Sequence, residues 1–155
     1  MKLKILAIDS KRPEWARKAF SDYARRFDRS IKVEFCSLGL VRRSKTLNKS
    51  VLIEKEGVKL LSYIKVGETL ISLDRRGSSW NTLELKEKFE EWLSLSLNVS
   101  FIIGGPDGLS SSCLKKSKEV WSLSPLTFPH AIIPVLVIEQ LYRAWSIGQN
   151  HPYHR

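Results

Sequence analysis

FIIGGPDGLS, residues 101–110, joins a short apolar run to a turn rich in glycine. Phe101, Ile102 and Ile103 have the side chains of a buried strand. Glycine has no Cβ, so the chain can bend sharply over residues 104–108 and a ligand can approach the main chain closely. Ligands of open α/β sheets bind at the carboxyl ends of strands. We therefore predict a ligand-binding turn at this position.

A second stretch of the same kind is WSLSPLTFPH, residues 121–130. It begins at the end of a short run that is typical of a strand. Two such loops at one edge of a sheet predict a pocket for a small molecule, formed largely by main-chain groups.

Strand and helix patterns alternate along the whole chain. Pro13 suits the first turn of a helix, and Asn81 is a suitable N-cap for the helix that follows it. The order of elements predicts an α/β fold with a mainly parallel sheet and flanking helices, in one domain spanning residues 1–155. We expect strands at 2–8, 31–38, 69–73, 97–103 and 119–123, a loop at 39–48, and helices at 12–27, 51–64, 82–93, 111–118 and 130–147.

The last predicted helix, residues 130–147, is apolar on nearly every side. A helix with this pattern is buried on more than one side. In a chain of 155 residues, one of those sides is expected to contact a second subunit, so we predict a homodimer.

The composition is that of a globular protein, with 43% hydrophobic and 27% charged residues. No apolar run reaches the roughly 18 residues of a membrane-spanning helix, and the first residues lack the apolar segment of a signal peptide. Cys36 and Cys113 supply neither a disulfide framework nor a zinc site. We therefore expect a cytoplasmic protein with free thiols, no metal and no membrane partner.

The charge is distributed unevenly. The net charge is +10, and residues 1–77 hold 19 basic and 9 acidic side chains, whereas the remaining residues hold 7 of each. This excess predicts a polyanionic partner. Nucleic acid is favoured over a membrane because no segment has the pattern of a basic amphipathic anchor. The alternative is a solvated basic surface that only keeps the protein soluble; candidate contacts in the loop are Arg42, Arg43, Lys45 and Lys49.

The last six residues, NHPYHR, carry side chains that bind ligands or transfer protons. His151 and His154 are weak candidates for a metal pair, because Pro152 lies between them and no clear third ligand exists. We predict instead an ordered tail that faces RNA or substrate. Arg143, on the preceding helix, faces either the pocket or solvent.

The whole chain resembles the small bacterial SPOUT methyltransferases that N3-methylate a pseudouridine in 23S ribosomal RNA. Several blocks match this family in the same order over essentially the full length, which makes the resemblance specific. The blocks are residues 73–74, 101–108, 121–124, 126–130, 141–146 and 150–155.

This resemblance implies a C-terminal trefoil knot, a bent S-adenosyl-L-methionine bound inside it, a homodimer, and action on assembled ribosomes. It also implies a catalytic, RNA-facing end formed by Tyr153, His154 and Arg155. The residues that it implies for cofactor binding are Leu73, Gly104, Gly105, Pro106, Gly108, Leu123, Ser124, Pro125, Leu126, Thr127, Phe128 and His130.

Methyl transfer to N3 of a uracil-type base requires loss of the N3 proton, because the neutral nitrogen is a poor nucleophile. His154 or Asp107 could accept this proton, and Arg143 or Arg155 could offset negative charge on the base. Two plainer interpretations stay open: Asp107 only caps the following helix, and His130 only hydrogen-bonds the backbone.

The chain departs from the family at Asp9-Ser10, where relatives often have glycine, and we expect this acid to alter a surface loop that meets RNA. The rival function is a non-catalytic RNA- or ribosome-binding module. An enzyme that uses another nucleotide is disfavoured, because the chain contains neither a P-loop nor a dinucleotide-binding glycine motif.

Overall fold

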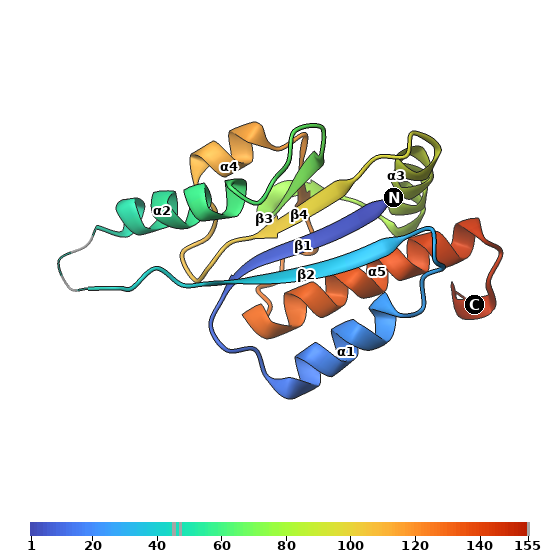
Figure 1. The fold of residues 1–155 in the computed structure, drawn as a ribbon, viewed down its shortest axis with the longest axis horizontal. Coiled ribbons are helices and arrows are strands. Elements are labelled where there is room, and N and C mark those ends of the chain that lie inside the picture. The colour runs from blue at the N-terminus through green and yellow to red at the C-terminus, as the bar shows by residue number, and fades with distance from the viewer. Residues whose placement is uncertain (45, 47, 155) are drawn as a thin grey trace.

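A five-stranded sheet forms the centre of the protein in our computed structural model, which describes residues 1–44, 46 and 48–154 (Figure 1). The strand order is β2-β1-β4-β3-β5, and every neighbouring pair is parallel. The predicted α/β class with a mainly parallel sheet is therefore confirmed. The strands are β1 (Lys2–Asp9), β2 (Lys32–Gly39), β3 (Thr69–Ser79), β4 (Val99–Ile103) and β5 (Glu119–Ser122).

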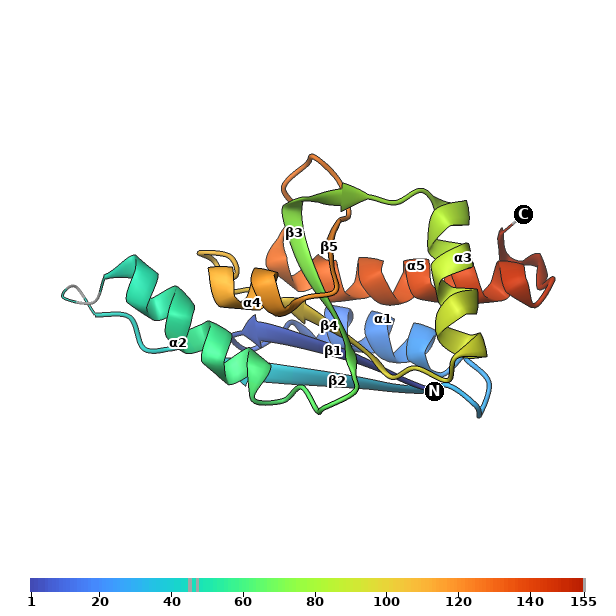
Figure 2. The same cartoon turned by 90° about the horizontal axis from the view of Figure 1, so that it is seen from above.

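Helices cover both faces of this sheet (Figures 1 and 2). One face packs against α1 (Glu14–Ala24), α3 (Thr82–Ser94) and α5 (Ile133–Gly148), and the other against α2 (Lys49–Leu61) and α4 (Ser111–Lys116). Two short 3₁₀ helices, η1 (His130–Ile132) and η2 (Pro152–His154), flank α5. In the part of the chain that is described, no helix is long and apolar enough to cross a membrane.

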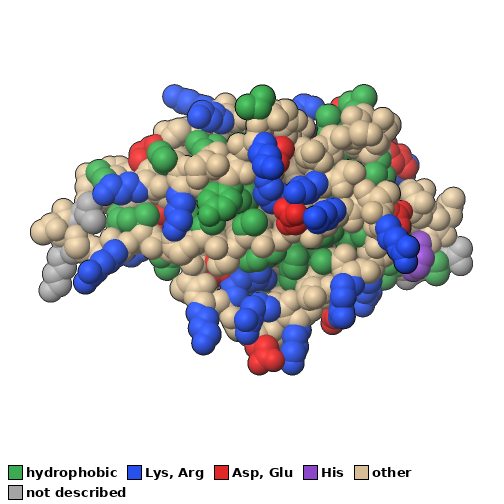
Figure 3. Space-filling view, viewed as in Figure 1, with side chains coloured by type: hydrophobic (Ala, Val, Ile, Leu, Met, Phe, Trp, Pro, Cys, Tyr) green, Lys and Arg blue, Asp and Glu red, His purple; other side chains and the backbone are tan. Residues whose placement is uncertain are grey.

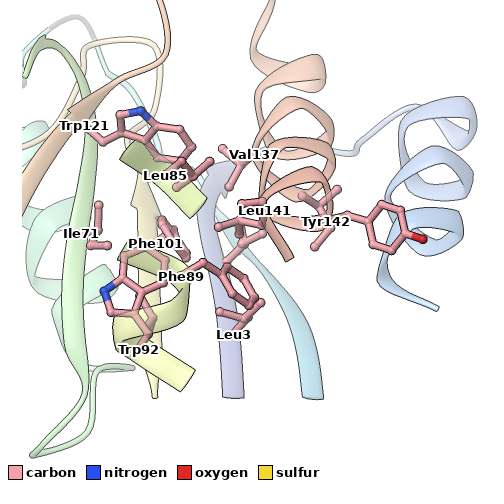
Figure 4. Close-up of a cluster of buried hydrophobic side chains, with 14 of the residues drawn as sticks. Leu3, Ile71, Leu85, Phe89, Trp92, Phe101, Trp121, Val137, Leu141 and Tyr142 are labelled. Carbon is pink, nitrogen blue, oxygen red and sulfur yellow. The ribbon is translucent and has the colours of Figure 1, made fainter. Parts of the chain in front are cut away.

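Strand β1 shows why the sheet is covered on both faces. Leu3, Ile5 and Ala7 point toward α1, α3 and α5, whereas Leu6 and Ile8 point toward α2 and α4, and all five are fully buried. Side chains of a strand alternate between faces, and a parallel sheet buries both. Figure 4 shows the larger of the two cores, where side chains from β1, β3, β4, β5, α3 and α5 meet.

Helix α3 begins where the sequence predicts. The Asn81 side chain accepts hydrogen bonds from the Leu83 and Glu84 main-chain N–H groups at 2.9 and 3.0 Å, and the Glu84 side chain accepts one from the Asn81 N–H. This capping box satisfies donors that the first helical turn leaves free. The prediction of Asn81 as N-cap is confirmed.

Strand β3 is longer than predicted. The strand predicted at 69–73 continues to Ser79, and its register to β5 shifts so that Leu73 and Ser78 both lie opposite Trp121. The intervening residues 74–77, which we name the β3 arm, bulge out of the ladder. A Cβ on Gly77 would lie 2.3 Å from the Val120 carbonyl oxygen, so only glycine permits this close return to β5.

A buried ionic group ties together the amino-terminal edge of the sheet. Lys4 Nζ donates hydrogen bonds to Glu68 Oε2 at 2.8 Å and to the Tyr63 carbonyl at 2.9 Å, and Ser100 Oγ donates to Glu68 Oε2 at 2.7 Å. The Lys4 and Glu68 side chains are only 7% and 6% exposed. Burial alone would raise the pKa of Glu68, but the hydrogen bonds from Lys4 and Ser100 outweigh burial and lower that pKa.

We predict that Glu68→Gln lowers the free energy of unfolding by about 3 to 5 kcal/mol at neutral pH, because it leaves the Lys4 ammonium buried without its counterion. The folded-state pKa of Glu68 is depressed, so the carboxylate contributes fully above its ordinary pKa of 4.5, and this contribution is lost as the pH falls through the lower folded value. Urea denaturation between pH 7 and pH 3 measures both effects. A variant that matches the wild type at pH 7 would contradict this account.

Candidate active site

A cavity of about 640 Å³ lies at the carboxyl ends of β3, β4 and β5. It is where the two loops predicted from the sequence meet. Of the residues expected to bind a cofactor, all but one line this cavity: Leu73, Gly104, Gly105, Pro106, Gly108, Leu123, Ser124, Leu126, Thr127, Phe128 and His130. A separate hollow of about 410 Å³ lies on the outer surface of α2 and contains none of them.

Pro125 is the exception, because its side chain is exposed and does not line the cavity. The turn around it is held by side chains: Ser124 Oγ accepts a hydrogen bond from the Leu126 N–H at 3.0 Å, and Ser122 Oγ donates to the Ser124 carbonyl at 3.3 Å. Leu126 faces the cavity from the same turn although it is 71% exposed.

The glycine turn after β4 closes on itself. The Gly108 N–H donates to the Gly105 carbonyl at 3.0 Å, and Gly108 has a φ of 89°, which favours glycine. A Cβ on Gly104 would lie 2.5 Å from the Gly108 carbonyl oxygen. Gly104 and Gly108 are therefore required by the turn itself, and not only by a ligand's approach.

Gly105 makes room for a side chain that the sequence analysis did not single out. A Cβ on Gly105 would lie 2.9 Å from Glu56 Oε2 and 3.1 Å from Ile8 Cγ2. Glu56 is 2% exposed, and its Oε1 accepts a hydrogen bond from the Val41 N–H at 3.2 Å. The sequence gives no signal for Glu56, because an acid on an amphipathic helix is usually solvated.

His130 joins the two cavity loops. Its Nε2 donates a hydrogen bond to the Gly104 carbonyl at 2.7 Å, and because a carbonyl oxygen only accepts, Nε2 must carry a proton. The His130 ring also lines the cavity. The plainer interpretation of His130 as a backbone hydrogen-bonding residue is therefore confirmed, and it coexists with a place in the cavity wall.

Asp107 is held by two cations. It pairs with Arg43, and its Oδ1 lies 3.3 Å from Lys49 Nζ. Burial alone would raise the pKa of Asp107, but the hydrogen bonds from Arg43 and Lys49 lower it. A carboxylate with a lowered pKa is a poor proton acceptor. Ser110, not Asp107, caps α4. Asp107 instead holds the loop at Arg43 and the first residue of α2, Lys49, against the glycine turn.

Asp9 does not lie in a surface loop, contrary to our expectation. It is the last residue of β1, is 8% exposed, and lies 3.7 Å from the buried Arg12 Nε. Arg12 in turn packs over the Phe35 ring, 4.0 Å from its centroid. The acid is therefore part of a buried contact between β1, β2 and the start of α1.

The C-terminal tail follows the end of α5 that is opposite to the end joined to the cavity loops (Figure 1). The cavity includes Ile133, the first residue of α5, whereas the tail follows Gly148, its last residue. A helix of 16 residues is about 24 Å long at about 1.5 Å per residue. The structure therefore does not bring Tyr153 and His154 to the expected cofactor residues within one chain.

Tyr153 packs against α1 and α5. Its hydroxyl donates to Glu139 Oε1 at 3.0 Å and lies 3.0 Å from the Tyr23 hydroxyl. Burial and these two contacts raise the pKa of Tyr153, so the phenol stays protonated at neutral pH. Arg143 Nε donates to the same Glu139 oxygen at 3.0 Å, and the Arg143 guanidinium lies 5.0 Å from the Tyr153 ring centroid.

His154 is exposed at the end of η2. Arg155, the fourth expected catalytic residue, lies outside the described residues, as does Lys45 of the basic loop.

A family model described as a predicted SPOUT methyltransferase matches residues 1–154. The chain belongs to the SPOUT methyltransferase family. Among solved structures, a probable methylase family protein from Haemophilus influenzae Rd KW20 has a TM-score of 0.57 at 14% identity, over 96% of this chain and 68% of that chain. The SpoU methyltransferase AviRb from Streptomyces viridochromogenes, solved in complex with the cofactor AdoMet, has a TM-score of 0.46 at 9% identity, over 92% of this chain and 57% of that chain.

The first of these similarities shows a shared fold. The trefoil knot implied by the family resemblance depends on how the chain threads, and it stays a prediction. Within the described residues, no group of three or more His, Cys, Asp or Glu side chains could hold a metal ion.

We predict that Gly105→Ala lowers the free energy of unfolding by about 1 to 3 kcal/mol, because the added methyl group meets Glu56 and Ile8. Gly39→Ala is the matched control, since the nearest atom to its Cβ would be Lys59 Nζ at 3.9 Å. Urea denaturation of both variants gives the comparison. Equal stability of the two would show that Gly105 does not face the packed layer beneath the turn.

Proposed function

We propose that this SPOUT methyltransferase transfers a methyl group from S-adenosyl-L-methionine to N3 of a pseudouridine in 23S ribosomal RNA, acting on assembled ribosomes as a homodimer. The observation that carries this proposal is the cavity itself: two loops that match the family motifs meet at the carboxyl edge of a parallel sheet and line one hollow.

The cavity suits this cofactor in size and in chemistry. Small-molecule sites enclose roughly 300 to 1,000 Å³, and this one measures about 640 Å³. The main-chain N–H groups of Thr127 and Phe128 form no hydrogen bond within the described residues, so they are available to an adenine edge. Leu73, Leu123 and Leu126 supply apolar walls for its faces.

S-adenosyl-L-methionine, when bound, supplies a methyl group on an activated sulfonium. The protein then has two tasks, which are to align the base with this methyl group and to accept the N3 proton. Asp107 is unsuited to the second task because Arg43 and Lys49 hold it as a carboxylate of lowered pKa. We assign the proton to His154, whose exposed side chain is the remaining candidate base.

The proposed reaction needs two subunits. The tail lies about one α5 length, roughly 24 Å, from its own cavity, so the tail would complete the cavity of a partner. Ile132, Val135, Leu136 and Ile147 are apolar residues along η1 and α5 that are only half-buried in the single chain. A twofold-symmetric contact through this face would bury them.

RNA binding is supported by the charge excess of the first half of the chain. Figure 3 shows Lys and Arg side chains gathered along the lower edge of the visible face, over α1. Arg42 and Arg43, adjacent in the basic loop, differ in their surroundings: Arg43 pairs with Asp107 and lies 3.9 Å from Glu56, whereas Arg42 is exposed and has no ion pair within the described residues. We therefore assign RNA contact to Arg42 and loop anchoring to Arg43.

We predict that Leu126→Ala weakens S-adenosyl-L-methionine binding by about fivefold, because an apolar contact with the bound cofactor, worth about 1 kcal/mol, is lost from the cavity wall. Leu126 is already 71% exposed, so the fold should be unaffected. The control is Leu83→Ala on α3, which removes a leucine of similar exposure, 61%, from another surface. Isothermal titration calorimetry measures both. If the wild-type protein binds no cofactor at millimolar concentration, the rival function of a non-catalytic RNA-binding module would be favoured instead.

Mixed dimers test the shared site. Leu126→Asp should prevent cofactor binding in the cavity, and His154→Ala should remove the proposed proton acceptor from the tail. Each variant alone should therefore be inactive. A heterodimer retains one cavity and one tail that are both intact, and an equal mixture should recover about a quarter of wild-type activity. Mass spectrometry of ribosomal RNA, which detects one added methyl on one pseudouridine, is the readout. No recovery on mixing, with dimers verified by light scattering, would show that cavity and tail of one chain act together.

A further inference from the structure

The β3 arm, residues 74–77, forms part of the cavity rim, and its two arginines are in different states. Arg76 is neutralised by its neighbour: its Nε and Nη2 donate to the two oxygens of Asp74, each at 2.9 Å. These hydrogen bonds are the main cause of the lowered pKa of Asp74. Asp74 and Arg76 together therefore present almost no net charge at the rim.

Arg75 keeps its charge. It lines the cavity, is exposed, and forms no ion pair with any of the described residues. The other cation in the cavity wall outside the arm is Lys49, which already contacts Asp107 at 3.3 Å. Arg75 is thus the cavity cation that forms neither a salt bridge nor a side-chain hydrogen bond with any described carboxylate.

The arm holds Arg75 in a defined place. The Asp74 side chain also accepts a hydrogen bond from the Arg76 main-chain N–H at 2.9 Å, which fixes the turn around Arg75. Gly77 packs directly against the Val120 carbonyl, and Ser78 and Ser79 rejoin β5. Both ends of the arm are therefore anchored, and less conformational entropy is lost when Arg75 binds a ligand.

We propose that Arg75 binds a phosphate of the RNA backbone beside the nucleotide that enters the cavity. This inference rests on the proposed function. A guanidinium offers two parallel donors that match phosphate oxygens, and Arg75 is exposed at the rim of the cavity, where an RNA backbone would pass.

The test compares three variants in binding to purified bacterial ribosomes over a range of salt concentrations. Arg75→Gln should weaken binding about fivefold to tenfold near 0.1 M salt and lower the slope of log affinity against log salt by about one, as expected for one lost phosphate contact. Arg75→Lys keeps the charge and should retain most of that slope. Lys65→Gln removes one exposed charge at the opposite edge of the sheet and is the matched control.

Affinity for S-adenosyl-L-methionine, measured by calorimetry, should be the same in Arg75→Gln as in the wild type. Two results would overturn the inference: an equal loss in Lys65→Gln, which would indicate a general charge effect, or a loss of cofactor affinity with unchanged ribosome binding, which would assign Arg75 to the cofactor. Failure of the proposed function is distinct, because it appears in the wild-type protein as absence of cofactor binding and of methyl transfer.

Discussion

The hydrogen bond from His130 to the Gly104 carbonyl, 2.7 Å long, is the contact on which the cavity depends. It joins the turn after β4 to the segment that leads from β5 into α5, and these two segments form most of the cavity wall. Among the described residues, it is the only hydrogen bond that joins these two segments. A buried or half-buried polar contact of this kind fixes a shape more sharply than apolar packing does, because its geometry is directional.

The elements that sequence could predict are those set by local patterns. The apolar runs of β1 and β4, the N-cap at Asn81 and the two loops after β4 and β5 all follow from residues that are close in the chain. The β3 arm could not be predicted, because its path is set by the contact of Gly77 with Val120, on another strand. The polar sequence of the arm is equally compatible with an ordinary turn.

The roles of three acidic residues could not be predicted from the sequence either. Acidic residues usually lie at the surface. Here Glu56 and Asp9 are buried, and Asp107 pairs with Arg43 and Lys49. The distance between the tail and the cavity could not be predicted for another reason. Residue types indicate which groups can react, but the length of α5 determines which of them lie close together. The family and the position of the cavity were therefore easier to predict from the sequence than the placement of the tail relative to the cavity.

The length of helix α5 sets the distance between the cavity and the tail of one chain. One residue inserted into it would advance the tail by about 1.5 Å and turn it by about 100°, since a helix has about 3.6 residues per turn. The same insertion at the exposed residues 65–67, which lie between the Lys4 contacts of Tyr63 and Glu68, would be absorbed locally. Insertions and deletions should therefore be tolerated least in α5, although most of this helix contacts neither the cofactor nor the RNA. They should be tolerated best in the loops at the amino-terminal edge of the sheet.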